Sequence, residues 1–87
     1  MKKKIEVTYS RAKIGELDRH YYDGDGNVIG HLLRNTNGIG YRVMFEPHIL
    51  IHDSIEVGSQ PHGFYLFKEA LSKGGYEVYY DPNRPIV

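Results

Sequence analysis

The chain has 87 residues, no cysteine, and 11 basic against 11 acidic side chains, so its formal net charge is zero. A chain of this length fills one hydrophobic core, which predicts a single domain over residues 1–87. The lack of cysteine excludes disulfide staples, thiolate nucleophiles and cysteine-ligated zinc sites, and the short apolar runs exclude a transmembrane helix.

The first part of the chain is predicted to form strands. Apolar and polar residues alternate strictly over residues 4–10, and a period of two is typical of a strand with one buried face. The alternation is weaker over residues 11–22, where Gly15 indicates a bulge or the turn between two strands. This part of the chain is therefore expected to be strand-rich as far as Tyr22.

Two glycine-containing segments are predicted to be hairpin turns. Residues 23–27 read Asp-Gly-Asp-Gly-Asn, and residues 35–38 read Asn-Thr-Asn-Gly. Glycine has no Cβ, so it readily adopts the positive φ angles that tight hairpins require. Strands are therefore expected at residues 28–33 and 41–46.

A further short strand is predicted after Pro47. Proline cannot donate to a strand ladder, so it should end the strand that precedes it. Residues 48–52 alternate again and are predicted to form a strand, which Ile55 and Val57 would extend.

The hydrophobic period changes after this point and predicts a helix over about residues 60–73. Ser59 or Gln60 can cap its N-terminus, and Pro61 suits its first turn, where the missing N–H costs nothing. Apolar residues recur at i, i+3 and i+7, which places a stripe of them on one face. The glycine pair at residues 74–75 should end the helix.

These elements predict an α+β fold built from an antiparallel β-meander of 4–6 strands. The helix should pack on one face of the sheet, because a meander with one apolar face must bury it. Residues 76–80 alternate and are predicted to form a C-terminal strand, which should pair with the first or the third strand of the meander. Residues 81–85 contain two prolines and are expected to be irregular.

Metal and cofactor motifs are absent or incomplete. His48 and His52 would share one face of a helix, but on the expected strand they lie roughly 13 Å apart and cannot share a metal ion. The Asp-x-Asp-x-Asn segment at 23–27 has the first ligands of a calcium loop, yet Val28 and Arg34 occupy the positions that need glycine and glutamate. No glycine-rich phosphate-binding motif is present. We therefore predict no metal and no cofactor.

One cluster of residues has the types that a metal-free ribonuclease uses. Such an enzyme needs a base for the 2′-hydroxyl and a cation beside the phosphate. Small ribonucleases on α+β folds of this size supply an analogy at the level of the fold only. The residues concerned are Arg19, His20, Tyr21 and Tyr22, with Tyr41 and Arg42 on a neighbouring strand.

Tyrosine is unusually abundant, with eight residues against three phenylalanines and no tryptophan. Tyrosine is favoured where one end of the ring stays in water, as at interfaces, although its β propensity alone also enriches it in sheets. The adjacent pairs at 21–22 and 79–80 must point to opposite faces of their strands. One ring of each pair should therefore be exposed unless both faces are covered.

These observations favour a non-catalytic binding module over an enzyme. The preferred function is docking on a larger macromolecule, a protein before a nucleic acid, in order to inhibit or modulate it. Small accessory and inhibitor proteins of phages and mobile elements have this character, and the expected location is cytoplasmic without membrane association. The candidate partner-binding residues are Arg19, Tyr21, Tyr22, Arg42, Tyr79 and Tyr80.

The alternative is a nucleic-acid-binding protein or a metal-free ribonuclease that uses the basic, tyrosine-rich N-terminal half. Residues 1–42 carry eight basic and five acidic side chains, a net +3, whereas residues 43–87 carry three and six, a net −3. Overall neutrality weakens this alternative, because phosphate contacts dominate nucleic-acid affinity. A homodimer through an edge strand is a third expectation, since it would hide an unpaired β edge.

Overall fold

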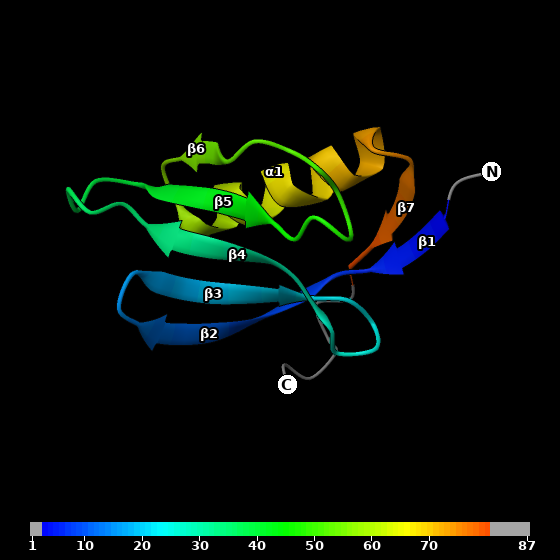
Figure 1. The fold of residues 1–87 in the computed structure, drawn as a ribbon, viewed down its shortest axis with the longest axis horizontal. Helices are drawn as coiled ribbons and strands as arrows, with labels where there is room; N and C mark the ends of the chain where they lie inside the picture. The colour runs from blue at the N-terminus through cyan, green and yellow to red at the C-terminus, as the bar shows by residue number, and fades with distance from the viewer. Residues whose placement is uncertain (1–2, 81–87) are drawn as a thin grey trace.

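A five-stranded antiparallel sheet, one helix and a separate pair of parallel strands make up the fold (Figure 1). The computed structural model describes residues 3–80, so the segment 81–85 lies outside the described part. The elements in chain order are β1 (Lys3–Glu6), β2 (Thr8–Ile14), β3 (Leu17–Tyr22), β4 (Val28–Arg34), β5 (Tyr41–Phe45), β6 (Ile55–Val57), α1 (Gln60–Lys73) and β7 (Tyr76–Tyr79). The predicted α+β class is confirmed.

The five-stranded sheet is a simple meander with the order β2-β3-β4-β5-β6. Both predicted hairpin turns form. In the first, the Asp23 side chain accepts hydrogen bonds from the backbone N–H groups of Asp25 and Asn27, both at 2.9 Å, and Gly26 has a φ of +86°. In the second, Gly38 has a φ of +76°. The turn chemistry read from the sequence therefore sets the pairing of β3 with β4 and of β4 with β5.

The strand expected over residues 4–10 is divided into β1 and β2. Its first half pairs with β7, as a parallel strand, with Ile5 opposite Val78. Its second half enters the meander beside β3. The expected pairing of the last strand with the first is thus confirmed for β1, and Figure 1 shows this pair set apart from the main sheet.

The strand expected at residues 48–52 does not form. The backbone N–H groups of Ile49 and Leu50 both donate to the Glu46 carbonyl, which makes a turn rather than a strand. Ile51 is 90% exposed, so the alternation of this segment does not mark a buried face. Ile55–Val57 forms β6 by itself, and Pro47 accounts for the break because it cannot continue the ladder of β5.

Helix α1 covers one face of the sheet. Ser59 caps it by accepting a hydrogen bond from the His62 N–H at 3.3 Å. Phe67 and Leu71 are fully buried in the core. The helix approaches β4 closely at Gly30, where an added Cβ would collide with the Phe67 ring. Within residues 3–80 no helix has the length and apolar content needed to cross a membrane.

The register of the sheet assigns side chains to its two faces. Tyr21, Gly30 and Phe45 lie side by side on β3, β4 and β5. The Tyr21 and Phe45 rings contact Phe67 of the helix, and a Cβ added at Gly30 would contact it too. Successive residues of a strand point to opposite faces. The neighbouring row therefore projects from the face opposite α1, and it consists of Ser10, His20, His31 and Met44.

Candidate functional site

Two histidines face each other on the sheet face opposite α1. His20 of β3 is the direct register partner of His31 of β4. Their Nδ1 atoms are 3.1 Å apart, and their rings meet edge to face with centroids 5.2 Å apart. A hydrogen bond between two imidazole nitrogens needs one of them protonated and the other not. The pair therefore holds a single hydrogen on the line between the rings.

Glu46 extends this pair into a chain of three groups. Its Oε1 lies 2.8 Å from Nε2 of His31, and the two side chains are 33% and 28% exposed, respectively. A carboxylate accepts hydrogen bonds, so Nε2 of His31 carries the proton. In neutral His31 the Nδ1 atom is then the acceptor for the Nδ1–H of His20. This arrangement leaves an unprotonated Nε2 on His20.

His20 is held in its neutral form at neutral pH. Partial burial, and after it the neighbouring His31 imidazole, lower the pKa of His20 below its ordinary value of 6.5. Burial acts because the charged form loses water, and His31 acts because two neighbouring cations repel each other. An uncharged imidazole with one free nitrogen is the form that can accept a proton.

Tyr22 and Arg42, two of the predicted partner-binding residues, belong to the same face. The Tyr22 ring centroid is 5.9 Å from that of His20, and its hydroxyl accepts a hydrogen bond of 3.0 Å from Ser10 Oγ. Arg42 lies two residues before Met44 on β5, so it points to the same side of the sheet. The sequence cluster is thus brought together in part, around a histidine pair that was not among the predicted site residues.

Arg19 and Tyr21 lie on the opposite face, toward the helix. Tyr21 is 0% exposed and packs against Phe67 with the two rings tilted and their centroids 4.5 Å apart, so its ring cannot contact a partner. The Arg19 guanidinium is folded over the Tyr9 ring at 4.7 Å and pairs with Asp18 at 3.4 Å. Strand alternation places Tyr21 in the core once the helix covers its face, so burial argues against a partner-binding role for Tyr21, whereas that role for Arg19 stays a prediction.

A second group of side chains, the Lys68 cluster, lies between α1 and the end of β7. The ammonium of Lys68 is 4.5 Å from the centroid of the Phe64 ring and 4.7 Å from that of Tyr80. Tyr65 and Tyr80 are 58% and 40% exposed. Tyr65, Lys68 and Tyr80 line a shallow depression of about 360 Å³. The Phe64 and Tyr80 rings meet edge to face with centroids 5.0 Å apart, and the ammonium beside them is attracted by the electron-rich rings, which orders this surface before any partner binds.

Tyr79 lies apart from the Lys68 cluster. It is 45% exposed, and its hydroxyl donates a hydrogen bond of 2.6 Å to Glu77. The ammonium of Lys4 lies 5.9 Å from the centre of its ring. The adjacent pair at 79–80 therefore behaves as strand alternation requires, with its two rings on different sides of the chain.

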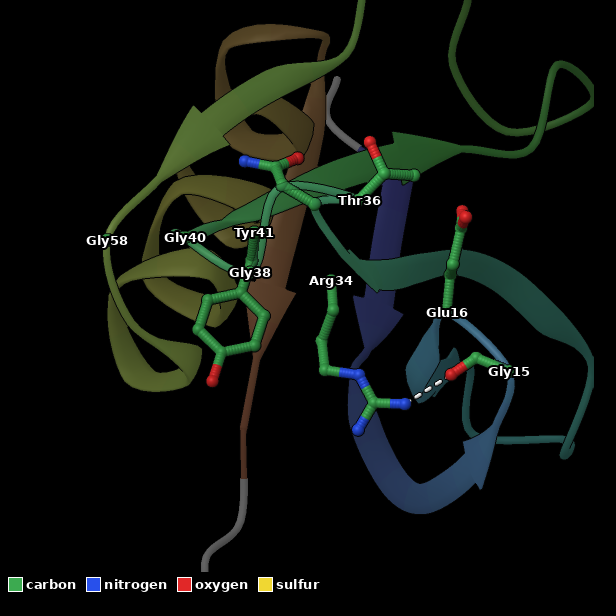
Figure 2. Close-up of a pocket in the computed structure, with 9 residues that line it drawn as sticks. Gly15, Glu16, Arg34, Thr36, Gly38, Gly40, Tyr41 and Gly58 are labelled. Carbon is green, nitrogen blue, oxygen red and sulfur yellow. Dashed lines mark hydrogen bonds between the residues drawn. The ribbon is translucent and has the colours of Figure 1, made fainter.

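A pocket of about 510 Å³ opens at the end of the sheet beyond the helix N-terminus. Figure 2 shows the Arg34 side chain between the Tyr41 ring and the Gly15 carbonyl, to which its guanidinium donates a hydrogen bond. Arg34 and Tyr41 are direct register partners on β4 and β5. Glu16 and Gly58 complete the opposing walls. Its lining carries one basic and one acidic side chain, Arg34 and Glu16, so this pocket has no single preferred ligand class.

Metal-ligating side chains do not gather in the described part of the chain. Across residues 3–80 no three histidine, aspartate or glutamate side chains are grouped so that they could hold a metal ion. Comparisons with known protein families, with curated proteins and with solved structures gave no match to this chain.

Proposed function

We propose that this domain is a cytoplasmic binding module that docks on a larger protein and inhibits or modulates it, in the manner of small accessory proteins of phages and mobile elements. The Lys68 cluster is the observation that carries the proposal. Its rings bring large contact area with little conformational freedom to lose, and tyrosines of this kind often supply much of the binding energy at interfaces.

The chemistry of the cluster favours an acidic segment of the partner. The ammonium of Lys68 lies beside the exposed Tyr80 ring, whose hydroxyl can donate a hydrogen bond to a carboxylate, whereas the Tyr65 hydroxyl already donates to Glu69. The neighbouring carboxylate of Glu69 is already paired with Lys73 at 2.9 Å. Because the rings hold Lys68 in place, a partner need not order this side chain on binding.

The test is affinity capture of the tagged protein from nuclease-treated lysate of its native host. The wild type should retain a partner that the double variant Tyr65→Ala, Tyr80→Ala loses, while both proteins keep similar melting temperatures. Ile39→Ala is the matched control, because Ile39 is an exposed apolar side chain in the β4–β5 turn, outside the cluster. Identical capture by the wild type and the double variant would contradict the proposal, as would capture that disappears with nuclease.

A further inference from the structure

Glu46, His31 and His20 form a chain of hydrogen bonds, and the Glu46 carboxylate determines which nitrogen of each histidine carries the proton. Glu46 fixes the proton of His31 on Nε2, and His31 then fixes the proton of His20 on Nδ1. The second nitrogen of an imidazole takes its role from the hydrogen bond that the first one makes. Nε2 of His20 is therefore the free acceptor at the end of the chain, and no hydrogen bond to it is recorded within residues 3–80.

The chain also stabilises the product of proton uptake. When Nε2 of His20 accepts a proton, its Nδ1–H still donates to His31, whose Nε2–H still donates to Glu46. The positive charge created on the pair is then balanced by the Glu46 carboxylate through two hydrogen bonds, which strengthen when one partner is ionised. The three groups together have the construction of a general base with two supporting groups.

The substrate must bring its own nucleophile to this base. Ser10, the nearest hydroxyl on β2, is only 9% exposed and donates its hydrogen to Tyr22. RNA carries a 2′-hydroxyl beside each phosphodiester, so a base that removes its proton is sufficient to start cleavage. Arg42 lies on the same face, two strands from His20 and opposite Glu56, and is the cation that a bound phosphate would meet there, while the Tyr22 ring can stack on a base.

We infer that the sheet face opposite α1 is a general-base site for RNA, with His20 as the catalytic residue and with His31 and Glu46 as positioning residues. This activity goes beyond the proposed docking function, whose cluster lies between α1 and β7. The two surfaces are separate, so a failed test of the docking surface would leave the general-base site standing, and a failed test of the general-base site would leave the docking surface standing.

The reaction balances without a redox partner or a covalent enzyme intermediate. Nε2 of His20 takes the proton of the 2′-hydroxyl as O2′ forms a bond to phosphorus. The bond from phosphorus to O5′ breaks, and O5′ takes a proton from water. The hydroxide left by that water accepts the proton held on His20, which restores the neutral base. The products are a 2′,3′-cyclic phosphate and a 5′-hydroxyl end.

The direct test uses a labelled RNA oligonucleotide and the same sequence with 2′-deoxy sugars, both in the presence of a chelator. The wild type should cleave the RNA and leave the deoxy strand intact. His20→Ala should lower the rate about 100-fold or more, the usual contribution of a general base. His62→Ala is the matched control, because His62 is exposed on the first turn of α1. RNA left intact by the wild type would overturn the inference. Equal rates for His20→Ala and the wild type would do so too, as would cleavage that occurs only when the chelator is left out.

Glu46 is tested by the pH dependence of the rate. His20 is flanked by Ser10 of β2, by the Tyr22 ring and by His31 of β4, which connects it to Glu46. Arg42 lies farther along the same face, opposite Glu56 of β6. Glu46→Gln removes the negative charge that favours proton binding to the pair, so the acid limb of the rate profile should move to lower pH and the rate should fall. Glu46→Asp should restore part of the rate. An unmoved acid limb in Glu46→Gln would contradict the positioning role.

The tautomers supply a readout that needs no variant. Nitrogen NMR of the wild-type protein labelled at histidine should show Nδ1 of His20 protonated and Nε2 bare, with the opposite arrangement in His31. The reverse assignment in both rings would refute the direction of the chain. The inference can therefore be tested on the wild-type protein even if the variants unfold.

Discussion

Substitution of Gly30 by alanine tests the close contact between α1 and the sheet. An added Cβ at this position would stand 2.7 Å from the Met44 carbonyl oxygen and 2.8 Å from Cζ of Phe67, and contacts under 3.0 Å essentially never occur at a real Cβ. Neither neighbour is free to move. The carbonyl belongs to the adjacent strand, and the Phe67 ring is fully buried. Overpacking of this kind costs about 1–3 kcal/mol.

For a domain of this size each kcal/mol moves Tm by about 4–8 °C, so Gly30→Ala should lower Tm by roughly 4–24 °C. Gly58→Ala is the matched control, since a Cβ there meets no atom within 4 Å and its φ is not in the left-handed region. Gly58→Ala should leave the free energy of unfolding unchanged or raise it by about 0.4–1 kcal/mol, because alanine lowers the conformational entropy of the unfolded chain. Thermal and urea unfolding followed by circular dichroism would measure both variants. If Gly30→Ala unfolds at the same temperature as the wild type, α1 does not lie on β4 as described.

Three further predictions concern single groups. Tyr21→Phe should raise the free energy of unfolding by about 1 kcal/mol, because the buried Tyr21 hydroxyl has no hydrogen-bond partner within residues 3–80. A lower free energy of unfolding in urea would mean instead that the hydroxyl is hydrogen-bonded. Ser59→Ala should cost about 1 kcal/mol through loss of the helix cap, measured by the same method, and an unchanged midpoint would place the start of the helix elsewhere. The pKa of His20 is lower in the folded protein, so the unfolded chain binds this proton more readily. The free energy of unfolding should be at its full value above pH 6.5 and should fall as the pH drops below 6.5, less steeply in His20→Gln than in the wild type. An equally steep fall in both proteins would contradict the direction of the pKa shift.

The meander and the helix could be predicted because each has a local cause. Asp23 and the glycines of the two turns determine where the chain reverses, and Ser59 marks where the helix begins. The segment 48–52 was mistaken for a strand because its alternation resembles one. Pairing depends on a neighbouring strand with free hydrogen-bonding groups, and a pattern of side chains carries no information on that neighbour.

The histidine pair was missed although the sequence contains a signal for it. His20 and His31 lie at equal distances along the chain from the Asp25–Gly26 peptide bond, so a hairpin centred there places them opposite each other, as the structure does. Glu46 could not be found in this way. Its backbone extends the ladder by donating to the Ile29 carbonyl, and its carboxylate then reaches His31 diagonally across the pair of strands.

The core and the histidine chain depend on the same register of β3 against β4. A shift by one residue would turn Tyr21 away from Phe67 and at the same time turn His20 toward the helix, because the side-chain period of a strand is two. Packing on the covered face therefore positions the hydrogen bonds on the other face. Gly30→Ala separates the two effects: its Cβ strains the helix side without changing which residues are paired. A folded Gly30→Ala protein should keep the proton of His20 on Nδ1, whereas loss of that tautomer would mean that the helix side and not the register holds the pair.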